Sequence, residues 1–408
     1  MDLVTSQPGH GLILVLNCGS SSIKFAVFDA ADPEQRKPLW NGKVQGIGGP
    51  KPDFGETGAA PFPIELDAGH PHRDALQLIR EHVAARLDGR RIAAVAHRVV
   101  HGGNKYFSPV RVDSGVLADL RSYIPLAPLH QPFALETMAI LMAEQPDIVQ
   151  VACFDTAFHR TLPKVEKQLP LPRAAWERGL RRYGFHGLSY EYMASALPAR
   201  YGKLAQGKVI VAHLGSGASL CAMYNLESVA TTMGFSALDG LMMGTRTGSI
   251  DPGAVIYLME IEKLSLKQVS HILYHESGLL GVSGISAEPR VLLPLEQGTD
   301  EWAAHASDAL ALYIRRIVRE IGALVAVLGG LELLVFTAGV GEHNPEIRRR
   351  ICAAFSFLGL QLDAGANAGD AARISAAGSA VTVAVEPTDE ESVAAAHARR
   401  LLHQSGRE

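Results

Sequence analysis

Several familiar signatures are missing from this sequence of 408 residues. No C-x-x-C pair occurs, so neither a zinc ribbon nor a thioredoxin motif is expected. The four cysteines stand singly in apolar or glycine-rich surroundings, which favours free thiols in a reducing compartment. The first residues, MDLVTSQPGHG, lack the basic and apolar regions of a signal peptide, and a cytoplasmic protein is therefore expected.

The catalytic motifs of several enzyme classes are also absent. The pattern G-x-x-x-x-G-K-[ST] does not occur, which disfavours a P-loop kinase. No H-R-D and D-F-G pair marks an ordinary protein kinase, and neither G-x-S-x-G nor H-E-x-x-H is found. The formal net charge is -4, without the basic footprint of a nucleic-acid binder, so no nucleic-acid partner is expected.

One apolar run, residues 321–341, is long enough to cross a bilayer. However, Gly329 and Gly330 interrupt it and Glu332 adds a charge. The residues before it continue the same helical spacing and carry three arginines. We therefore interpret the run as a helix that ends at the glycine pair, followed by a buried strand, and expect no membrane partner.

Short apolar runs bounded by glycine alternate with longer helical patterns, which is typical of an α/β protein. Strands are expected at residues 12–16, 23–28, 92–96, 148–154, 209–212, 220–224 and 333–337. Helices are expected at residues 73–87, 131–145, 188–197, 266–275, 301–328, 345–355 and 390–403. Residues 32–72 are rich in proline and glycine and are expected to form turns and an irregular hairpin.

Two segments about half a chain apart resemble each other: ILVLNCGSSSIKFAVFD from Ile13 and VIVAHLGSGASLCAMYN from Val209. Each is an apolar strand, a Gly/Ser turn and a second apolar strand. A duplicated unit indicates two related domains that face each other across a cleft. The alternative is two ordinary hairpins in one large sheet. Because both turns carry the same polar chemistry, we favour the duplication.

The turn chemistry indicates phosphate or nucleotide binding. Glycine lets the backbone approach closely, and serine hydroxyls with nearby N–H groups form an anion nest. Lys24 follows the first turn and suits a phosphate. A third loop, TAGVGEHN at residues 337–344, stands between a strand and a helix, where an anion or ribose could bind. GSGASL has Leu220 in place of the third glycine of a dinucleotide fingerprint, which argues against a dehydrogenase.

Polar side chains stand at expected strand ends or glycine turns at five places: Arg98, Asp155, His186, Arg246 and Glu390. Each also has an ordinary explanation. Asp155 could form a turn, and Arg98 could pair with a surface acid. Glu390 could be the carboxylate of a capping box behind Thr388 or Asp389. Together, however, they place two cations, an imidazole and two carboxylates where ligands bind in open α/β folds.

The chain resembles the acetate, propionate and butyrate kinase family. The matching segments are NCGSSSIKF, HRVVHGG, PLHQP, FDTAFH, YGFHGLSYEY, HLGSGASL, MGFSALDGLMMGTRTG, GISAEPR, FTAGVGEHNPEIR and PTDEES, in the family's order between residues 17 and 392. The resemblance implies the α/β fold shared by actin, hexokinase and the sugar kinases, with two duplicated ribonuclease-H-like domains around a cleft. We expect residues 1–155 with 387–408 to form one domain, and residues 156–386 the nucleotide-binding domain.

The resemblance also implies an activity and its partners. The expected reaction is ATP + acetate ⇌ ADP + acetyl phosphate, catalysed by a homodimeric phosphotransferase that uses a carboxyl group as acceptor. The expected cofactor is Mg²⁺, with Mn²⁺ as a substitute. Alternatives are a kinase for propionate or another short carboxylate and a catalytically silent nucleotide-binding protein.

The family's residue roles carry over to matching positions. Asn17 and Glu390 would hold Mg²⁺. Arg98 would bind the acetate carboxylate. The acyl pocket would be lined by Val100, Leu129, Phe185 and Ala237. His186 and Arg246 would stabilise the phosphoryl group in transfer, with Asp155 as the catalytic carboxylate. The nucleotide would contact Lys24, His213, Leu214, Gly215, Ser216, Gly217, Glu288, Pro289, Arg290, Gly339, Val340, Gly341, Glu342 and His343.

These roles make physical sense, because phosphoryl transfer depends mainly on positioning and charge stabilisation. Arg246 offers a planar fork to the phosphoryl oxygens, and Mg²⁺ neutralises the β and γ phosphate oxygens. Acetate is already ionised at neutral pH, so the nucleophile needs no base. We therefore expect Asp155 to orient Mg²⁺, its waters or an arginine.

Four residues depart from the family's usual pattern. Glu288 stands for aspartate and His343 for asparagine, and both bear on base or ribose preference. Ser249 replaces an aspartate near Arg246, which bears on the orientation of that arginine. Ala237 replaces a proline and leaves more space in the acyl pocket, so comparatively good use of propionate is expected.

Overall fold

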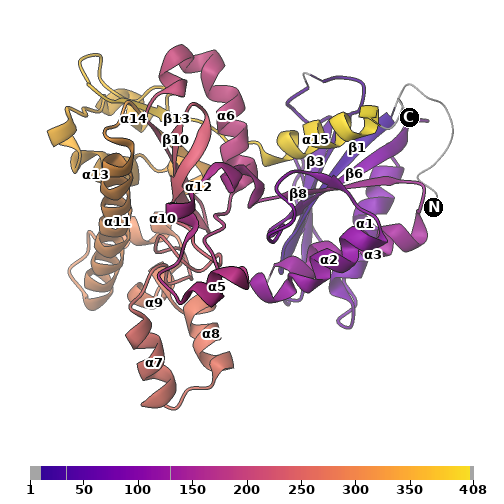
Figure 1. The fold of residues 1–408 in the computed structure, drawn as a ribbon, viewed down its shortest axis with the longest axis horizontal. Coiled ribbons are helices and arrows are strands. Elements are labelled where there is room, and N and C mark those ends of the chain that lie inside the picture. The colour runs from indigo at the N-terminus through magenta and orange to yellow at the C-terminus, as the bar shows by residue number, and fades with distance from the viewer. Residues whose placement is uncertain (1–10, 34, 129, 405–408) are drawn as a thin grey trace. The chain divides into compact units, whose positions relative to one another are not determined.

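A computed structural model describes residues 11–33, 35–128 and 130–404 (Figure 1). The chain divides into two compact units. Unit 1 is Met1–Ala157 with Asp389–Glu408, and unit 2 is Phe158–Thr388. The domain changes expected after residues 155 and 386 lie two residues before these boundaries.

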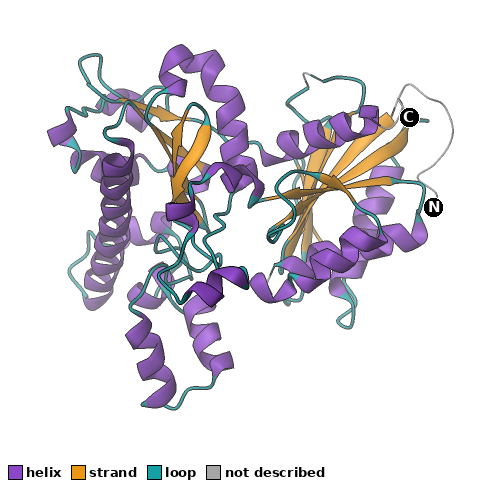
Figure 2. Ribbon diagram, in the orientation of Figure 1, coloured by secondary structure: helices purple, strands orange, loops and turns teal. Residues whose placement is uncertain are grey.

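Unit 1 is built on an eight-stranded sheet (Figure 2). Its strands run in the order β5-β4-β3-β2-β1-β6-β8-β7. They are β1 (Gly11–Cys18), β2 (Ser22–Asp29), β3 (Trp40–Gln45), β4 (Asp53–Glu56), β5 (Phe62–Pro63), β6 (Arg91–Val99), β7 (Val110–Arg111) and β8 (Val149–Phe154). The helices of this unit are α1 (Pro71–Ala84), α2 (Ser114–Ser122), α3 (Gln131–Glu144) and α15 (Glu390–Gln404).

Strand β1 shows why the central strands of this sheet have continuous apolar sequences. Leu12, Leu14 and Leu16 pack with residues of α1 and α3 in one hydrophobic cluster. Ile13 and Val15 are equally buried and point to the other face, on which α15 lies (Figure 1). Because helices cover both faces, neither set of alternating positions is polar.

Unit 2 repeats the central part of this sheet. Its strands are β9 (Val209–Leu214), β10 (Ala218–Tyr224), β11 (Glu227–Thr231), β12 (Leu333–Thr337) and β13 (Thr382–Val385). Their order is β11-β10-β9-β12-β13, with β11, β10 and β9 antiparallel and β9, β12 and β13 parallel. Strands β3-β2-β1-β6-β8 have the same order and directions. The duplication is therefore confirmed, and the alternative of two hairpins in one large sheet is wrong.

The helices of unit 2 are α4 (Lys164–Lys167), α5 (Arg173–Glu177), α6 (Gly187–Tyr201), α7 (Pro252–Glu260), α8 (Leu266–His275), α9 (Gly278–Ser283), α10 (Pro289–Leu295), α11 (Glu301–Leu328), α12 (Ala338–His343), α13 (Pro345–Ala353) and α14 (Ala364–Ala368). The apolar run at residues 321–341 is the end of α11, a turn, strand β12 and the first residues of α12, so the expected helix and strand are both present. Gly329 ends α11 in the left-handed region, at φ 67°. Among the described residues, no helix is long and apolar enough to span a membrane.

Residues 32–72 are more regular than expected. Strands β3 and β4 extend the sheet beyond β2 as antiparallel strands, and the short β5 adds to its edge.

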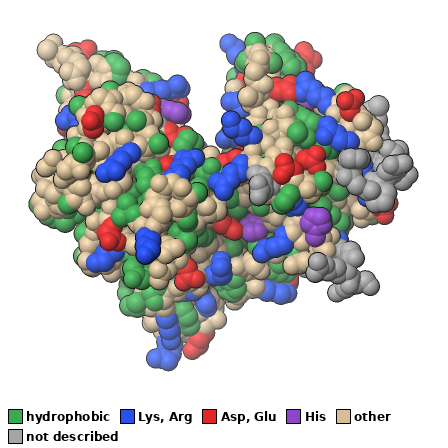
Figure 3. Space-filling model, turned by 90° about the horizontal axis from the view of Figure 1, so that it is seen from above, with side chains coloured by type: hydrophobic (Ala, Val, Ile, Leu, Met, Phe, Trp, Pro, Cys, Tyr) green, Lys and Arg blue, Asp and Glu red, His purple; other side chains and the backbone are tan. Residues whose placement is uncertain are grey.

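On the face drawn in Figure 3, the coloured Lys and Arg side chains are interspersed with Asp and Glu. Such a mixed surface does not create a strong field of one sign.

Candidate active site

Two parallel strands bring the first polar group together. β6 and β8 are neighbours, with Arg98 opposite Cys153 in register, and Asp155 directly follows β8. The guanidinium Nε of Arg98 donates to both carboxylate oxygens of Asp155, at 3.0 and 3.1 Å, and Nη2 donates to Oδ2 at 2.8 Å. The adjacent carboxyl ends of parallel strands thus place this pair, as expected for a ligand site in an α/β fold.

Glu390 completes this group from the first turn of α15. Its Oε2 lies 2.6 Å from Nη1 of Arg98. The capping role considered for Glu390 belongs to its neighbour, because Asp389 Oδ1 accepts the N–H of Ser392 at 2.9 Å. We call Arg98, Asp155 and Glu390 the Arg98 group. Its contacts use three of the five guanidinium N–H groups, so two remain for a ligand within the described part of the chain.

The Arg98 group has an excess of negative charge. Burial alone would lower the pKa of Arg98, but the charges of Asp155 and Glu390 raise it above its ordinary value. Burial raises the pKa of Glu390 to about 7, against the lowering effect of Arg98. Two carboxylates share one guanidinium, so the group lacks one positive charge when both are ionised.

This donor set fits Mg²⁺ delivered with a nucleotide. Among the described residues, no three acidic, histidine or cysteine side chains form a closed metal site. Mg²⁺ commonly binds one or two carboxylates together with waters and substrate phosphates, and Glu390 provides one. Asn17 on β1 is half-buried and paired in register with the exposed Lys24 on β2, whose charge acts on Glu390.

A second polar group forms in unit 2. His186 precedes α6 in a left-handed conformation, at φ 57°. A Cβ added at Gly217 would lie 2.6 Å from Nη2 of Arg246 and 3.3 Å from Nε2 of His186. Only glycine at position 217 therefore lets the two side chains approach the turn between β9 and β10. We call His186, Gly217 and Arg246 the Arg246 group.

Arg246 is a half-buried cation whose charge is not balanced by a carboxylate among the described residues. Its Nη1 donates to the carbonyl of Ala237 at 2.7 Å, and no ion pair with a carboxylate is found among the described residues. Burial lowers its pKa, because a charged guanidinium is costly to desolvate. Such a site favours an incoming anion. Ser249 does not contact Arg246; its hydroxyl donates to Asp239 Oδ1 at 2.7 Å.

Hydrogen bonds connect His213 to the end of unit 2. The rings of His186 and His213 stack with centroids 4.2 Å apart. Nδ1 of His213 lies 2.9 Å from Oγ of Ser189, which accepts the hydroxyl of Thr388 at 2.9 Å. The loop of His213, Leu214, Gly215, Ser216 and Gly217 is thus tied through Ser189 to the residue that ends unit 2.

The third loop differs from its expected form. Residues 338–343 form the short helix α12, and Ala338 adopts a left-handed conformation at φ 64°. The N–H of Ala338 donates to Glu342 Oε1 at 2.8 Å, and the N–H of Thr388 donates to the same oxygen at 3.3 Å. At this helix start the carboxylate of Glu342 therefore takes the place in which an external anion was expected.

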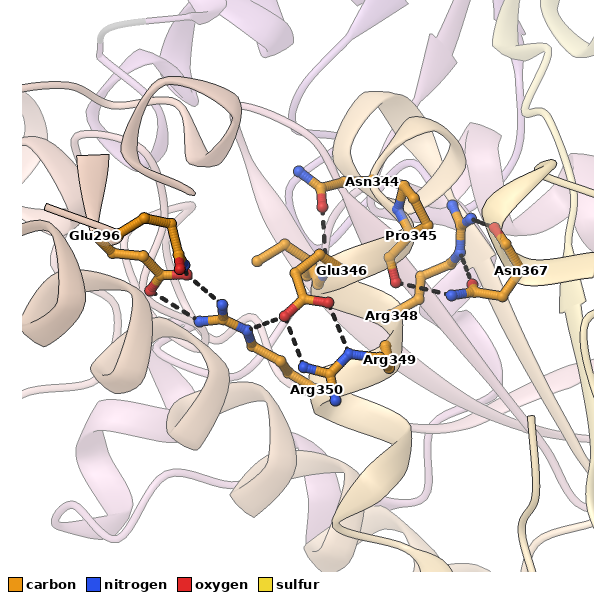
Figure 4. Close-up of polar contacts among 10 residues, drawn as sticks. Glu296, Asn344, Pro345, Glu346, Arg348, Arg349, Arg350 and Asn367 are labelled. Atoms are coloured by element: carbon orange, nitrogen blue, oxygen red, sulfur yellow. Dashed lines mark hydrogen bonds and ion pairs between the residues drawn. The ribbon is translucent and has the colours of Figure 1, made fainter. Parts of the chain in front are cut away.

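Arg348 holds this loop in place through its guanidinium, which Figure 4 shows beside Asn367. Its side chain is fully buried. Nη1 donates to the carbonyls of Gly341 and Glu342 at 2.9 and 2.8 Å. Nε and Nη2 donate to the side chain and carbonyl of Asn367 at 2.9 and 2.7 Å, and Nη2 also donates to Asp370 at 2.5 Å. The five donors are thus satisfied, whereas the next two arginines pair with Glu346 at the surface.

The remaining expected residues lie in less constrained surroundings. Glu288 and Arg290 are exposed and form an ion pair with each other, while Pro289 starts α10. His343 is 73% exposed. Phe185 and Ala237 are buried and Val100 is half-buried. Leu129 lies outside the described residues.

Comparisons with known proteins agree on one family. Residues 12–396 match the model of the acetokinase family. An acetate kinase of Rhodopseudomonas palustris strain TIE-1 is 47% identical over 397 residues, covering 96% of this chain and 98% of that protein. The crystal structure of acetate kinase from Porphyromonas gingivalis is 34% identical, with a TM-score of 0.84, covering 96% of this chain and 100% of that one. The crystal structure of a propionate kinase from Francisella tularensis is 31% identical, with a TM-score of 0.87, covering 96% of this chain and 99% of that one.

Proposed function

Because this chain belongs to the acetokinase family, we propose that it transfers the γ-phosphoryl group of ATP to acetate. A carboxylate oxygen of acetate forms a bond to the γ phosphorus as the bond to the β–γ bridging oxygen breaks, giving acetyl phosphate and ADP. The observation that carries this proposal is the half-buried Arg246 beside His186, whose charge no carboxylate balances among the described residues. It suits a group whose negative charge is shared by three oxygens.

We assign the carboxylate substrate to Arg98. Asp155 and Glu390 fix the guanidinium from two sides and leave two N–H groups, which can bind a carboxylate. Since acetate is already ionised, Asp155 acts by positioning Arg98 rather than as a base. Arg246 and His186 donate to the phosphoryl oxygens, and the glycine at position 217 lets that group come close.

We assign Mg²⁺ to Asn17 and Glu390, where it would neutralise the β and γ phosphate oxygens of ATP. Glu390→Gln removes one carboxylate charge but keeps an oxygen that can accept from Arg98, so the Mg²⁺ concentration for half-maximal rate should rise more than the KM for acetate. A titration of rate against Mg²⁺ and, separately, acetate measures both. An unchanged Mg²⁺ requirement would mean that Glu390 serves Arg98 alone. Mn²⁺ is expected to substitute.

The nucleotide is proposed to contact Lys24 and three loops of unit 2, at residues 213–217, 288–290 and 339–343. We propose units 1 and 2 as the functional domains, with the nucleotide loops on unit 2. A cytoplasmic location fits the four buried free cysteines.

We also propose a homodimer. Helix α7, which is described in full, has an apolar sequence and no buried side chain. Ile256, Tyr257 and Ile261 are each more than half exposed. An apolar helix left in water marks an interaction surface, and sedimentation velocity measures the oligomeric state.

A kinase for propionate is the second candidate, and Ala237 favours it. Its side chain is small where the family commonly has proline, and Arg246 fixes the backbone at that residue. The experiment that tests both candidates is a hydroxamate assay. Hydroxylamine traps the acyl phosphate formed from ATP and each member of a panel of short carboxylates. Trapping with acetate and propionate but not with longer acids supports a small pocket, and no trapping with any acid would overturn the kinase proposal.

A further inference from the structure

His186 is held by a chain of two buried hydroxyl groups. Nδ1 of its ring lies 2.8 Å from Oγ of Ser219 on β10. The same Oγ lies 2.5 Å from the hydroxyl of Tyr190 on α6. Ser219 and Tyr190 are both fully buried. One serine hydroxyl thus stands between a phenol and an imidazole.

The direction of the two hydrogen bonds follows from the donors that must be satisfied. Burial raises the pKa of Tyr190 well above its ordinary value, so this phenol keeps its proton. Ser219 is the one hydrogen-bond partner of the Tyr190 hydroxyl found among the described residues. A buried O–H that is not donated is costly, so Tyr190 donates to Ser219. The serine hydroxyl is then free to donate to Nδ1 of His186.

An imidazole that accepts at Nδ1 carries its proton on Nε2 when it is neutral. Nε2 is the His186 atom that lies toward Gly217 and Nη2 of Arg246. The donor of His186 is thereby presented beside the donor of Arg246.

We propose that Tyr190 and Ser219 are positioning residues that hold His186 in the tautomer protonated at Nε2, so that it donates a hydrogen bond to the phosphoryl group next to Arg246. This inference rests on the proposed phosphoryl transfer for its purpose. The tautomer itself is a property of the free protein and can be measured without substrate.

The test is ¹⁵N NMR of the full chain labelled in histidine, with the His186 signals assigned by their loss in His186→Asn. The wild-type protein is expected to show a protonated Nε2 and an unprotonated Nδ1. A protonated Nδ1 in the wild type would overturn the proposal even if Tyr190→Phe and Ser219→Ala failed to fold. Tyr190→Phe and Ser219→Ala should each give mixed tautomers. An unchanged spectrum in Tyr190→Phe would mean that Tyr190 does not help to set the tautomer of His186.

Kinetics supply the second readout. In Tyr190→Phe, kcat should fall about tenfold, as for one lost hydrogen bond, with an unchanged KM for ATP. Tyr313→Phe is the matched control, because Tyr313 is an equally buried tyrosine on α11 of the same unit, and it should leave both tautomer and kcat unchanged. Equal losses in the two variants would indicate general packing and overturn the proposal. A wild-type protein with the expected tautomer but no kinase activity would instead overturn the proposed function alone.

Discussion

At the scale of single residues, the polar groups are costly arrangements that packing alone does not require. His186 and Ala338 hold left-handed backbone conformations without being glycine, which costs about 1–3 kcal/mol each. Arg246 is half-buried with no carboxylate paired with it among the described residues. A ligand with negative charge would balance the charge of Arg246. Removal of the Arg246 side chain should therefore be the most informative substitution.

Arg246→Ala should lower kcat by roughly 10³-fold, because the charge that it meets develops mainly during transfer. ATP binding should remain largely intact. Arg246→Lys should restore little, since an ammonium group cannot offer the planar fork of the guanidinium. Steady-state kinetics and calorimetric ATP binding measure the two effects, with the exposed Arg86→Ala as control. A kcat close to that of the wild type in either Arg246 variant would contradict the assignment.

Ala237 makes a prediction about substrate choice. Its carbonyl accepts from Arg246, whereas its N–H makes no hydrogen bond among the described residues, so proline can be introduced without losing a donor. One methylene in an apolar pocket is worth about 1–3 kcal/mol. Ala237→Pro should therefore shift the kcat/KM ratio toward acetate over propionate by about tenfold. The same ratio in both proteins would mean that Phe185 or another neighbour already fills the space.

At the scale of elements, burial decides which ones the sequence reveals. Strands β1, β2, β9, β10 and β12 are apolar on both faces and were expected close to their observed positions. Helix α11 was expected with its observed bounds, because Asp300 caps its start and Gly329 ends it. Helix α7 was missed since it buries no side chain and so has no amphipathic pattern. Strand β13 was missed because it has only four residues.

The same reasoning explains which site residues could be found. Arg98 and Asp155 stand at strand ends, where a charge has no structural purpose, and this position alone singles them out. Arg348 lies in a run of three arginines that looks like a solvated helix face. The helical period nevertheless places it with Ile347, Ile351 and Cys352 on the buried face of α13, a signal that was available. Ser219, by contrast, sits in an apolar strand and gives no sign of its contact with His186.

Arg348→Lys should weaken the loop that contains residues 339–343. Lysine keeps the charge but has three donors on one atom, so it cannot hold the carbonyls of Gly341 and Glu342 together with Asn367. We expect a several-fold higher KM for ATP and a loss of about 2–4 kcal/mol in the free energy of unfolding. Arg349→Lys, at the neighbouring exposed position, is the matched control. Equal effects in the two variants would show that Arg348 has no special role.

At the scale of the whole molecule, two copies of one sheet topology carry different chemistry. The Arg98 group belongs to unit 1 and lies at the ends of β6 and β8. The Arg246 group belongs to unit 2 and gathers at the turn between β9 and β10. The shared topology explains why polar residues follow the strands in both units. It does not determine which charges appear there: in unit 1 one guanidinium lies between two carboxylates, whereas in unit 2 Arg246 has no carboxylate partner among the described residues.

Both units contain buried histidines, which predicts how each responds to acid. Burial lowers the pKa of His97 and His101 in unit 1 and of His159 in unit 2, to about 4 in each case. Below the ordinary histidine pKa of about 6.5 the unfolded chain binds protons that the folded chain does not, so stability falls as the pH decreases from there toward 4. Each histidine should cost about 2 kcal/mol between pH 6.5 and pH 5, whereas Glu390 in unit 1, whose pKa is raised in the folded chain, offsets part of this loss in that unit.

Urea unfolding at pH 7, 6 and 5 measures the loss of stability of each unit, because Trp40 reports on unit 1 while Trp176 and Trp302 report on unit 2. In a background with phenylalanine at the two unit 2 positions, Trp40 fluorescence follows unit 1 alone. His97→Gln keeps a polar side chain beside Gln150 but cannot titrate, so the dependence of unit 1 stability on pH should decrease by about one bound proton. An unchanged dependence in this variant would mean that His97 is already protonated in the folded protein at pH 5, and that its burial does not oppose the charge.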